Sequence, residues 1–213
     1  FSATEYMLYA ESPTLGDFPL KTELTIIHNN SFNPLVLFTE NSFLADLKLY
    51  LKIPKVPLEL LTLGSIFTLK NDPETSVFEP SDGRRIPIFL SPTQRDWVPT
   101  MGIGVVLDTR EKIYNPHFGM YGELTVSQSG GVFGGPADYM QLLADIRYFV
   151  PFGSDIIVLG ALGRYRPGTM GAYDLLHVGG SNTARAYSQD PDQYGQHEAL
   201  ATVEYRLEFF ERK

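Results

Sequence analysis

The sequence contains no cysteine, no long apolar run and no excess of positive charge. Without cysteine, the chain can have neither a disulfide framework nor a thiolate metal site. No stretch reaches the roughly 18 consecutive apolar residues of a membrane-spanning helix. The formal net charge is −8, and nucleic acid is therefore excluded as an expected partner, because phosphate binding needs a clustered basic surface.

The composition is that of a folded protein. The chain has 213 residues, of which 43% are hydrophobic and 13% aromatic, enough for the core of one structural unit. The first residues, Phe1 to Glu5, lack the basic and apolar regions of a signal peptide. We therefore expect a chain that is cytosolic, already processed or cut from something larger.

Alternation of apolar and polar residues is the dominant pattern. From Phe43 to Ile53 every second side chain is apolar, and the positions between them carry Asp46, Lys48 and Lys52. This period of two predicts β-strands with one apolar face. The predicted strands cover 2–10, 20–28, 43–53, 58–69, 98–110, 119–127, 139–150, 155–166 and 199–210.

The lengths of these strands favour a membrane barrel over a soluble lipocalin-like or sandwich protein. Strands of soluble proteins have about 5–6 residues, whereas tilted membrane strands need about 9–11. Short and long connections are predicted to alternate, the first long one over 29–42, as in outer-membrane barrels. The sequence thus predicts an all-β fold, a transmembrane up-and-down antiparallel β-barrel.

The two faces of these strands have different expected environments. Charged residues in rows, such as Asp145 with Arg147, suit a wet or plugged lumen. Aromatic residues near strand ends suit interfacial girdles or ordinary core, namely Tyr148, Phe149, Phe152, Phe209 and Phe210. The side chains predicted to face lipid are Leu47, Leu49, Ala144, Ile146, Val203 and Tyr205.

The longest predicted connection, about 167–196, carries the first candidate site. Gly179 and Gly180 permit close backbone approach, and Arg185, two residues before Tyr187, offers a guanidinium that a carboxylate can meet bidentately. Glu204 lies on the polar face of the following strand. We expect this connection to fold inward and Arg185 to bind Glu204, forming a lock between loop and barrel.

A second candidate site lies on one face of the strand 98–110. Gly102, Gly104, Asp108 and Arg110 share that face, which predicts a lumen-facing strand with a local ion pair. The two glycines are expected to leave room for an inserted loop.

No pattern predicts catalysis, a cofactor or a metal site. The histidines, His28, His117, His177 and His197, lack the spacing of metal ligands. The glycine-rich stretch 129–136 has no basic residue or helix after it, so we interpret it as a flexible hairpin loop rather than a phosphate cradle.

Taken together, the two sites resemble the BamA-type superfamily of outer-membrane assembly and secretion barrels, the bacterial surface antigen family. The resemblance rests on Gly-x-Gly with Asp-x-Arg at 102–110, Gly179-Gly180 followed by Arg185-Ala186-Tyr187, and Glu204-Tyr205. Ala186 takes the place of the glycine usual in the family. The resemblance covers residues 98 to 213, while residues 1–97 match only in general barrel character.

The resemblance implies a sixteen-stranded barrel in the bacterial outer membrane, of which residues 1–213 would be the central nine strands. Its implied function is non-enzymatic insertion or translocation of proteins. The implied partners are the lipid bilayer, nascent outer-membrane or secreted proteins, and periplasmic or lipoprotein accessory subunits. The alternatives are a barrel that anchors a separate enzymatic domain, such as a lipid hydrolase, and a passive pore.

Overall fold

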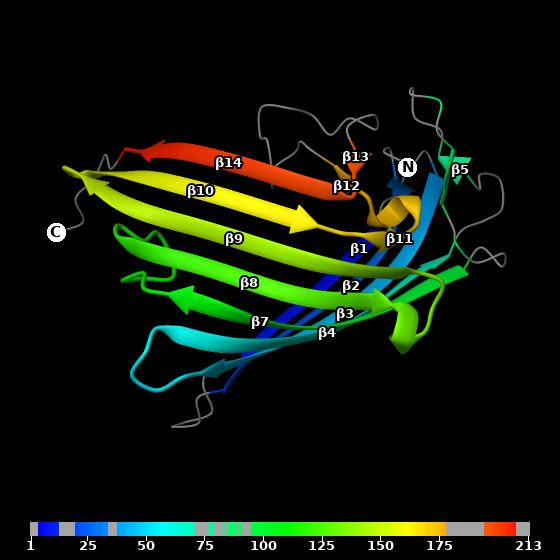
Figure 1. Cartoon of the computed structure of the whole chain (residues 1–213), viewed down its shortest axis with the longest axis horizontal. Helices are drawn as coiled ribbons and strands as arrows, with labels where there is room; N and C mark the ends of the chain where they lie inside the picture. The colour runs from blue at the N-terminus through cyan, green and yellow to red at the C-terminus, as the bar shows by residue number, and fades with distance from the viewer. Residues whose placement is uncertain are drawn as a thin grey trace.

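Nine long antiparallel strands form the main sheet (Figure 1). The structure is a computed structural model that describes residues 4–12, 20–33, 38–70, 77–78, 83, 85–88, 90, 95–177 and 194–207. The predicted all-β fold and its nine strands are confirmed. These strands are β1 (Thr4–Ser12), β2 (Leu20–Asn33), β3 (Phe38–Lys52), β4 (Leu58–Lys70), β7 (Arg95–Asp108), β8 (Gly119–Gly130), β9 (Asp138–Phe152), β10 (Asp155–Tyr165) and β14 (His197–Arg206).

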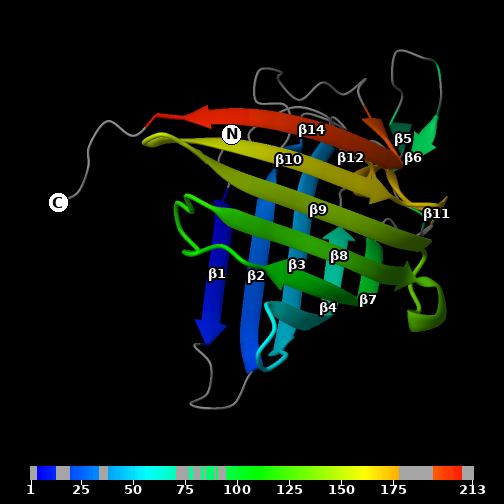
Figure 2. The ribbon, with the colours of Figure 1, turned by 60° about the vertical axis from the view of Figure 1, so that its left-hand side comes forward.

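Each long strand pairs with the next one along the chain, in the order β1-β2-β3-β4-β7-β8-β9-β10-β14. Figure 2 shows the curvature of this meander, with β1–β4 on one side and β8–β14 on the other. Within the described residues β1 and β14 each pair on one edge only, so the sheet is open. The remaining elements are short: β5 (Val77–Phe78), β6 (Ile86–Pro87), β11 (Gly168–Thr169), β12 (Leu176–His177), β13 (Tyr194–Gly195), and the 3-10 turns η1 (Gly131–Phe133) and η2 (Ala172–Asp174).

The long strands have the length that a membrane strand requires. The shortest, β1, has 9 residues, and the longest, β3 and β9, have 15, compared with the roughly 9–11 residues that a tilted strand needs to cross a bilayer. In the part of the chain that the structure describes, no helix is long and apolar enough to cross a membrane.

The sheet has an apolar outer face and a mixed inner face. On β9 the outer side chains Met140, Ile146 and Tyr148 are exposed, whereas the inner side chains Tyr139 and Phe149 are buried. We use "inner face" for the side of Tyr139 and "outer face" for the side of Ile146, because these two alternate along the strand. The inner face also carries the buried residues Tyr50, Leu61, Val98 and Val106.

The residues predicted to face lipid all lie on the outer face. Leu47, Ile146, Val203 and Tyr205 are exposed, with Val203 79% accessible, while Leu49 and Ala144 share their face and are half-buried. Exposed apolar side chains in such rows are expected only where lipid covers them.

Burial separates the aromatic residues near the end of β9 into the two expected kinds, girdle and core. Tyr148 and Phe152 are exposed on the outer face, as a girdle requires, but Phe149 is buried on the inner face with Ile156 and Val158. The alternation of β9 turns each successive side chain to the opposite face, so Phe149 cannot lie on the outer face with Tyr148. Phe209 and Phe210 lie outside the described residues.

The predicted alternation of connection lengths holds only in part. β2 and β3 pair as far as Asn33 and Phe38, which leaves only residues 34–37 between them instead of the predicted loop 29–42. The two connections that are long, 71–94 and 166–196, lie at the same end of the sheet. The glycine-rich stretch is a turn held by backbone hydrogen bonds from Gly131 N–H to Ala137 and from Gly134 N–H to Gly131, both 3.0 Å.

Candidate functional site

A cap covers the inner face at the end of the sheet where the long connections lie. We define the cap as the described residues 85–88 and 90 of one long connection and 166–177 of the other. Ile88 and Ala172 from these connections pack with Leu69 of β4, and Met170 packs with Val98 of β7 and Tyr139 of β9. All six side chains are buried, so the cap is part of the hydrophobic core.

Asp96 on β7 joins the two connections of the cap. One oxygen of its fully buried carboxylate, Oδ2, accepts hydrogen bonds from the backbone N–H of Leu90 (2.7 Å) and from the hydroxyl of Tyr173 (2.9 Å). The Tyr173 ring also packs on Phe67, with 5.6 Å between ring centroids. Burying a carboxylate costs free energy unless donors satisfy it. Each connection supplies one donor to Asp96, so each helps to stabilise the buried group to which the other connection is also bonded.

Asp174 is the second polar anchor of the cap. The hydroxyl of Tyr139 donates to Asp174 Oδ1 (3.0 Å), and Arg166 Nη1 donates to the backbone oxygen of Asp174 (2.6 Å). Arg166 Nε also donates to the side-chain oxygen of Gln141. Tyr139 and Gln141 are on β9, so these bonds attach the start of the β10–β14 connection to the barrel wall.

Burial sets the protonation behaviour of this part of the cap. It raises the pKa of Asp174 to about 6, because burial and the nearby Asp96 charge outweigh the opposing effects of Tyr139 and Arg166. Asp174 Oδ2 has no hydrogen-bond partner, which agrees with a carboxyl group that binds a proton readily. Burial also lowers the pKa of Arg166 and raises that of Tyr173.

A buried ion pair lies beside these residues on the inner face. Arg164 Nε of β10 is 3.4 Å from Glu198 Oε2 of β14, and the Glu198 side chain is only 3% exposed. Neither Glu198 oxygen nor Arg164 Nε has a hydrogen bond of good geometry. This ion pair near Arg166 is therefore weakly satisfied, buried at Glu198 and partly exposed at Arg164, whose side chain is 28% exposed.

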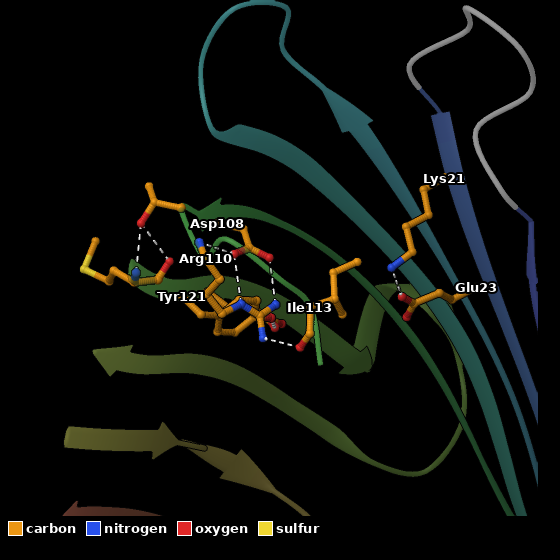
Figure 3. A network of polar contacts seen from close by, with 9 residues as sticks. Lys21, Glu23, Asp108, Arg110, Ile113 and Tyr121 are labelled. Atoms are coloured by element: carbon orange, nitrogen blue, oxygen red, sulfur yellow. Dashed lines mark hydrogen bonds and ion pairs between the residues drawn. The ribbon is translucent and has the colours of Figure 1, made fainter. Parts of the chain in front are cut away.

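The opposite end of the inner face carries a separate polar network (Figure 3). Arg110 makes two hydrogen bonds to the carboxylate of Asp108, 2.9 and 2.7 Å, and a longer one, 3.4 Å, to the backbone oxygen of Ile113. Its guanidinium lies over the Tyr121 ring, 4.8 Å from the centroid. The Asp108–Arg110 pair thus fixes the backbone where β7 ends.

Further inner-face pairs extend this network across the sheet. Lys21 and Glu23 of β2 form an ion pair (2.7 Å), and Tyr50 of β3 donates to Glu23 (3.1 Å). On β8, Tyr121 donates to Glu123 (2.7 Å). Such mixed charges and hydroxyls are typical of a barrel lumen.

Gly102 and Gly104 are in close contact with the neighbouring strand β8. A Cβ on Gly102 would lie 2.6 Å from the Ser127 side chain, and one on Gly104 would lie 2.6 Å from both the backbone oxygen of Leu124 and the side chain of Thr125. Ser127 and Thr125 are themselves buried. The glycines therefore permit a close approach of β8 to β7, and the predicted inserted loop remains a prediction.

The comparisons with known proteins agree with this geometry. The model of the Omp85 superfamily domain matches residues 61–213. The chain belongs to the Omp85 superfamily. The solved structure of BamA from Haemophilus ducreyi lacking POTRA domains 1–3 is similar, with a TM-score of 0.64 and 15% identity over 99% of this chain and 46% of that chain. No curated protein matches.

These findings confirm the predicted resemblance to BamA-type barrels. At 15% identity the solved structure supports the fold alone, and this Omp85 chain spans less than half the length of that BamA. The all-β membrane-barrel class is thereby shown, and the apolar outer face is the lipid-facing surface of an outer-membrane barrel.

Of the two residues in the predicted lock, Arg185 and Glu204, the structure describes only Glu204. Glu204 lies on the inner face of β14, where Arg206 Nε donates to it (3.0 Å) and the Arg206 guanidinium lies 5.8 Å from the centroid of the Phe149 ring. Arg185 lies outside the described residues, as do Gly179, Gly180 and Tyr187. The lock remains a prediction.

The sequence did not single out the residues of the cap. Asp96 stands next to Trp97 at a strand end, and Tyr173 and Asp174 lie in a connection without periodicity, so no local pattern marks them. In the described part of the chain no group of three or more His, Asp or Glu side chains could hold a metal ion. Chemically, this arrangement can fix the cap on the inner face and release it when its buried polar bonds break.

Proposed function

We propose that this Omp85 chain forms part of an outer-membrane barrel that inserts or translocates proteins. The cap carries this proposal, because a buried set of loop-to-wall contacts occupies the inner face at one end of the sheet. A passive pore has no need for a packed core at that position. A barrel that handles protein clients needs a lumen that stays sealed until a client arrives.

The proposed partners follow from the two faces. The outer face presents long rows of apolar side chains to the lipid bilayer. The clients would be nascent outer-membrane or secreted proteins, which pair with strand edges or pass along the inner face. Periplasmic or lipoprotein accessory subunits would assist. In this proposal the described residues carry no catalytic step.

The β10–β14 connection is proposed to continue inward beyond its described part, with Arg185 bound to Glu204. The position of residues 166–177 against the inner face supports this, since the connection starts on that side. Glu204 is half-exposed on the inner face, 41% by its side chain, and so has surface for a further donor.

The test uses the full-length protein in phospholipid vesicles, with a urea-unfolded outer-membrane barrel protein as client. We expect the client to fold faster than in protein-free vesicles, measured by its heat-modifiable mobility. Vesicles that contain a porin control for nonspecific effects of membrane protein. Equal folding rates in all three, combined with free solute flux, would instead indicate a passive pore, and release of fatty acids would indicate an attached lipid hydrolase.

A further inference from the structure

The turn between β8 and β9 presents an apolar tip. Val132 is 88% exposed and Phe133 is 38% exposed, and no residue from Ser129 to Ala137 is charged. A large apolar side chain that is almost fully exposed on a turn is unusual unless something covers it. The turn lies at the same end of the sheet as the two long connections.

The backbone of this turn is held in one conformation. Gly130 and Gly134 have φ values of 65° and 86°, a left-handed region that favours glycine. A Cβ on Gly130 would lie 1.8 Å from the backbone oxygen of Ala137, so only glycine fits there. The tip is therefore built into the fold.

The turn leans over the outer face, away from the cap. A Cβ on Gly135 would lie 2.4 Å from the backbone oxygen of Trp97 and 3.2 Å from Pro99, and one on Gly134 would lie 3.2 Å from the Trp97 ring. Trp97 is 44% exposed and alternates along β7 with the inner-face residues Asp96 and Val98. Figure 1 shows η1 at the end of β8, lower in the view than β12 and β13.

Trp97 marks one edge of the lipid-facing band. From Trp97 onward the outer row of β7 is apolar, with Trp97, Pro99, Met101, Ile103, Val105 and Leu107, and the charged Arg95 comes just before it at the start of the strand. The ten residue steps in this row, at about 3.3 Å each and inclined by about 40°, span about 25 Å, which is the height of the apolar band of outer-membrane barrels. Trp97 thus lies at the membrane–water interface, where tryptophan is enriched, and the tip packs beside it.

We propose that Val132 and Phe133, together with Trp97, insert into the interfacial and upper acyl-chain region of the lipid bilayer at this end of the sheet and anchor the barrel rim at β7–β9. Lipid is the occupant because the tip lies beside the apolar row from Trp97 to Leu107 and residues 129–137 carry no charge, while the charged Arg95 and Asp138 begin β7 and β9 at the edge of the apolar band. The anchor does not depend on protein insertion, since a passive pore of the same fold would have it as well.

The test places an environment-sensitive fluorophore at the tip. In the full-length protein without other cysteines, Val132→Cys is labelled with a nitrobenzoxadiazole dye and reconstituted in phosphatidylcholine vesicles. Ser154→Cys, in the exposed two-residue turn between β9 and β10, is the control. We expect a lipid nitroxide near the glycerol backbone to quench the tip label about threefold more than the control, and aqueous iodide to quench it less.

Substitutions at Phe133 change the polarity of the tip. In the labelled Val132→Cys protein, Phe133→Ser should reduce quenching by the lipid nitroxide, whereas Phe133→Leu should preserve it. Heat-modifiable mobility reports whether each variant has folded. If iodide quenches the tip label as strongly as the Ser154 control in folded protein, the tip lies in water and the proposal is overturned. The same holds if Phe133→Ser leaves lipid quenching unchanged.

Discussion

Tyr173 donates a hydrogen bond to Asp96 from 77 positions further along the sequence, at 2.9 Å. The same oxygen of Asp96 accepts the N–H of Leu90, so one buried carboxylate ties both long connections to β7. The two connections should therefore open together.

Removing the Asp96 carboxylate should loosen both connections. Asp96→Ala leaves two buried donors without their acceptor, and each unsatisfied donor costs about 1–3 kcal/mol. Tyr173→Phe, which removes one bond, should cost about 1 kcal/mol. The measurement is the rate at which a thiol reagent labels Ile88→Cys, a buried position of the 71–94 connection. A loss of about 1 kcal/mol in the stability of the closed cap would raise this rate about fivefold.

The matched control is Tyr121→Phe, which removes a tyrosine–carboxylate hydrogen bond of 2.7 Å at the opposite end of the inner face. It should leave labelling at position 88 unchanged. If Tyr173→Phe also leaves that rate unchanged, the two connections move independently.

Acidification should stabilise the cap. The pKa of Asp174 is raised to about 6 in the closed cap, so the closed form binds the proton more tightly than an open form with the ordinary value of 3.8. This contribution to stability is present at low pH and is lost as the pH rises through 6. Opening, measured by the same thiol labelling corrected for thiolate fraction, should be about tenfold less frequent at pH 5 than at pH 7.5.

Asp174→Asn removes the titration and should flatten this pH dependence. Arg147→Gln, on the more exposed ion pair with Asp145, should leave it intact. A pH dependence that persists in Asp174→Asn would assign the effect to another group.

A methyl group at Gly104 should destabilise the barrel. The new Cβ would meet the Leu124 backbone oxygen at 2.6 Å, and overpacking of this kind costs about 1–3 kcal/mol. Gly122→Ala is the matched control, because a Cβ there meets nothing within 4 Å. Urea unfolding in vesicles should show a lower midpoint for Gly104→Ala only, and equal midpoints would contradict the close approach of β8 to β7.

If Arg185 binds Glu204, the effects of substituting the two residues on stability should be coupled. Arg185→Ala and Glu204→Ala should each slow client folding and lower stability by more than the roughly 0–1 kcal/mol of an exposed pair but less than the about 3–5 kcal/mol of a buried one, because the Glu204 side chain is 41% exposed. The double variant should be little worse than either, because coupled neighbours are not additive. Additive losses in urea unfolding would show that the two residues act separately.

The sequence by itself determined the strands and their lipid-facing side. Alternation is a local property of one pleated strand, so Leu47, Ile146 and Val203 could be placed without knowledge of the rest of the chain. The alternation of apolar and polar residues was less reliable at strand ends. The polar run Asn29–Ser31 was predicted as loop, but pairing with β3 through Asn29↔Ser42 and Asn30↔Asn41 extends β2 across it, because a sheet neighbour overrides local propensity.

Only the tertiary structure determined which residues meet in the cap and how closely β8 approaches Gly102 and Gly104. Asp96, Tyr173 and Asp174 carry no local pattern, and their contacts exist only because the curved sheet brings both long connections to one end. A period along the chain fixes which side chains share a face, but which distant side chains then meet depends on strand register and curvature, and these are set by the whole sheet.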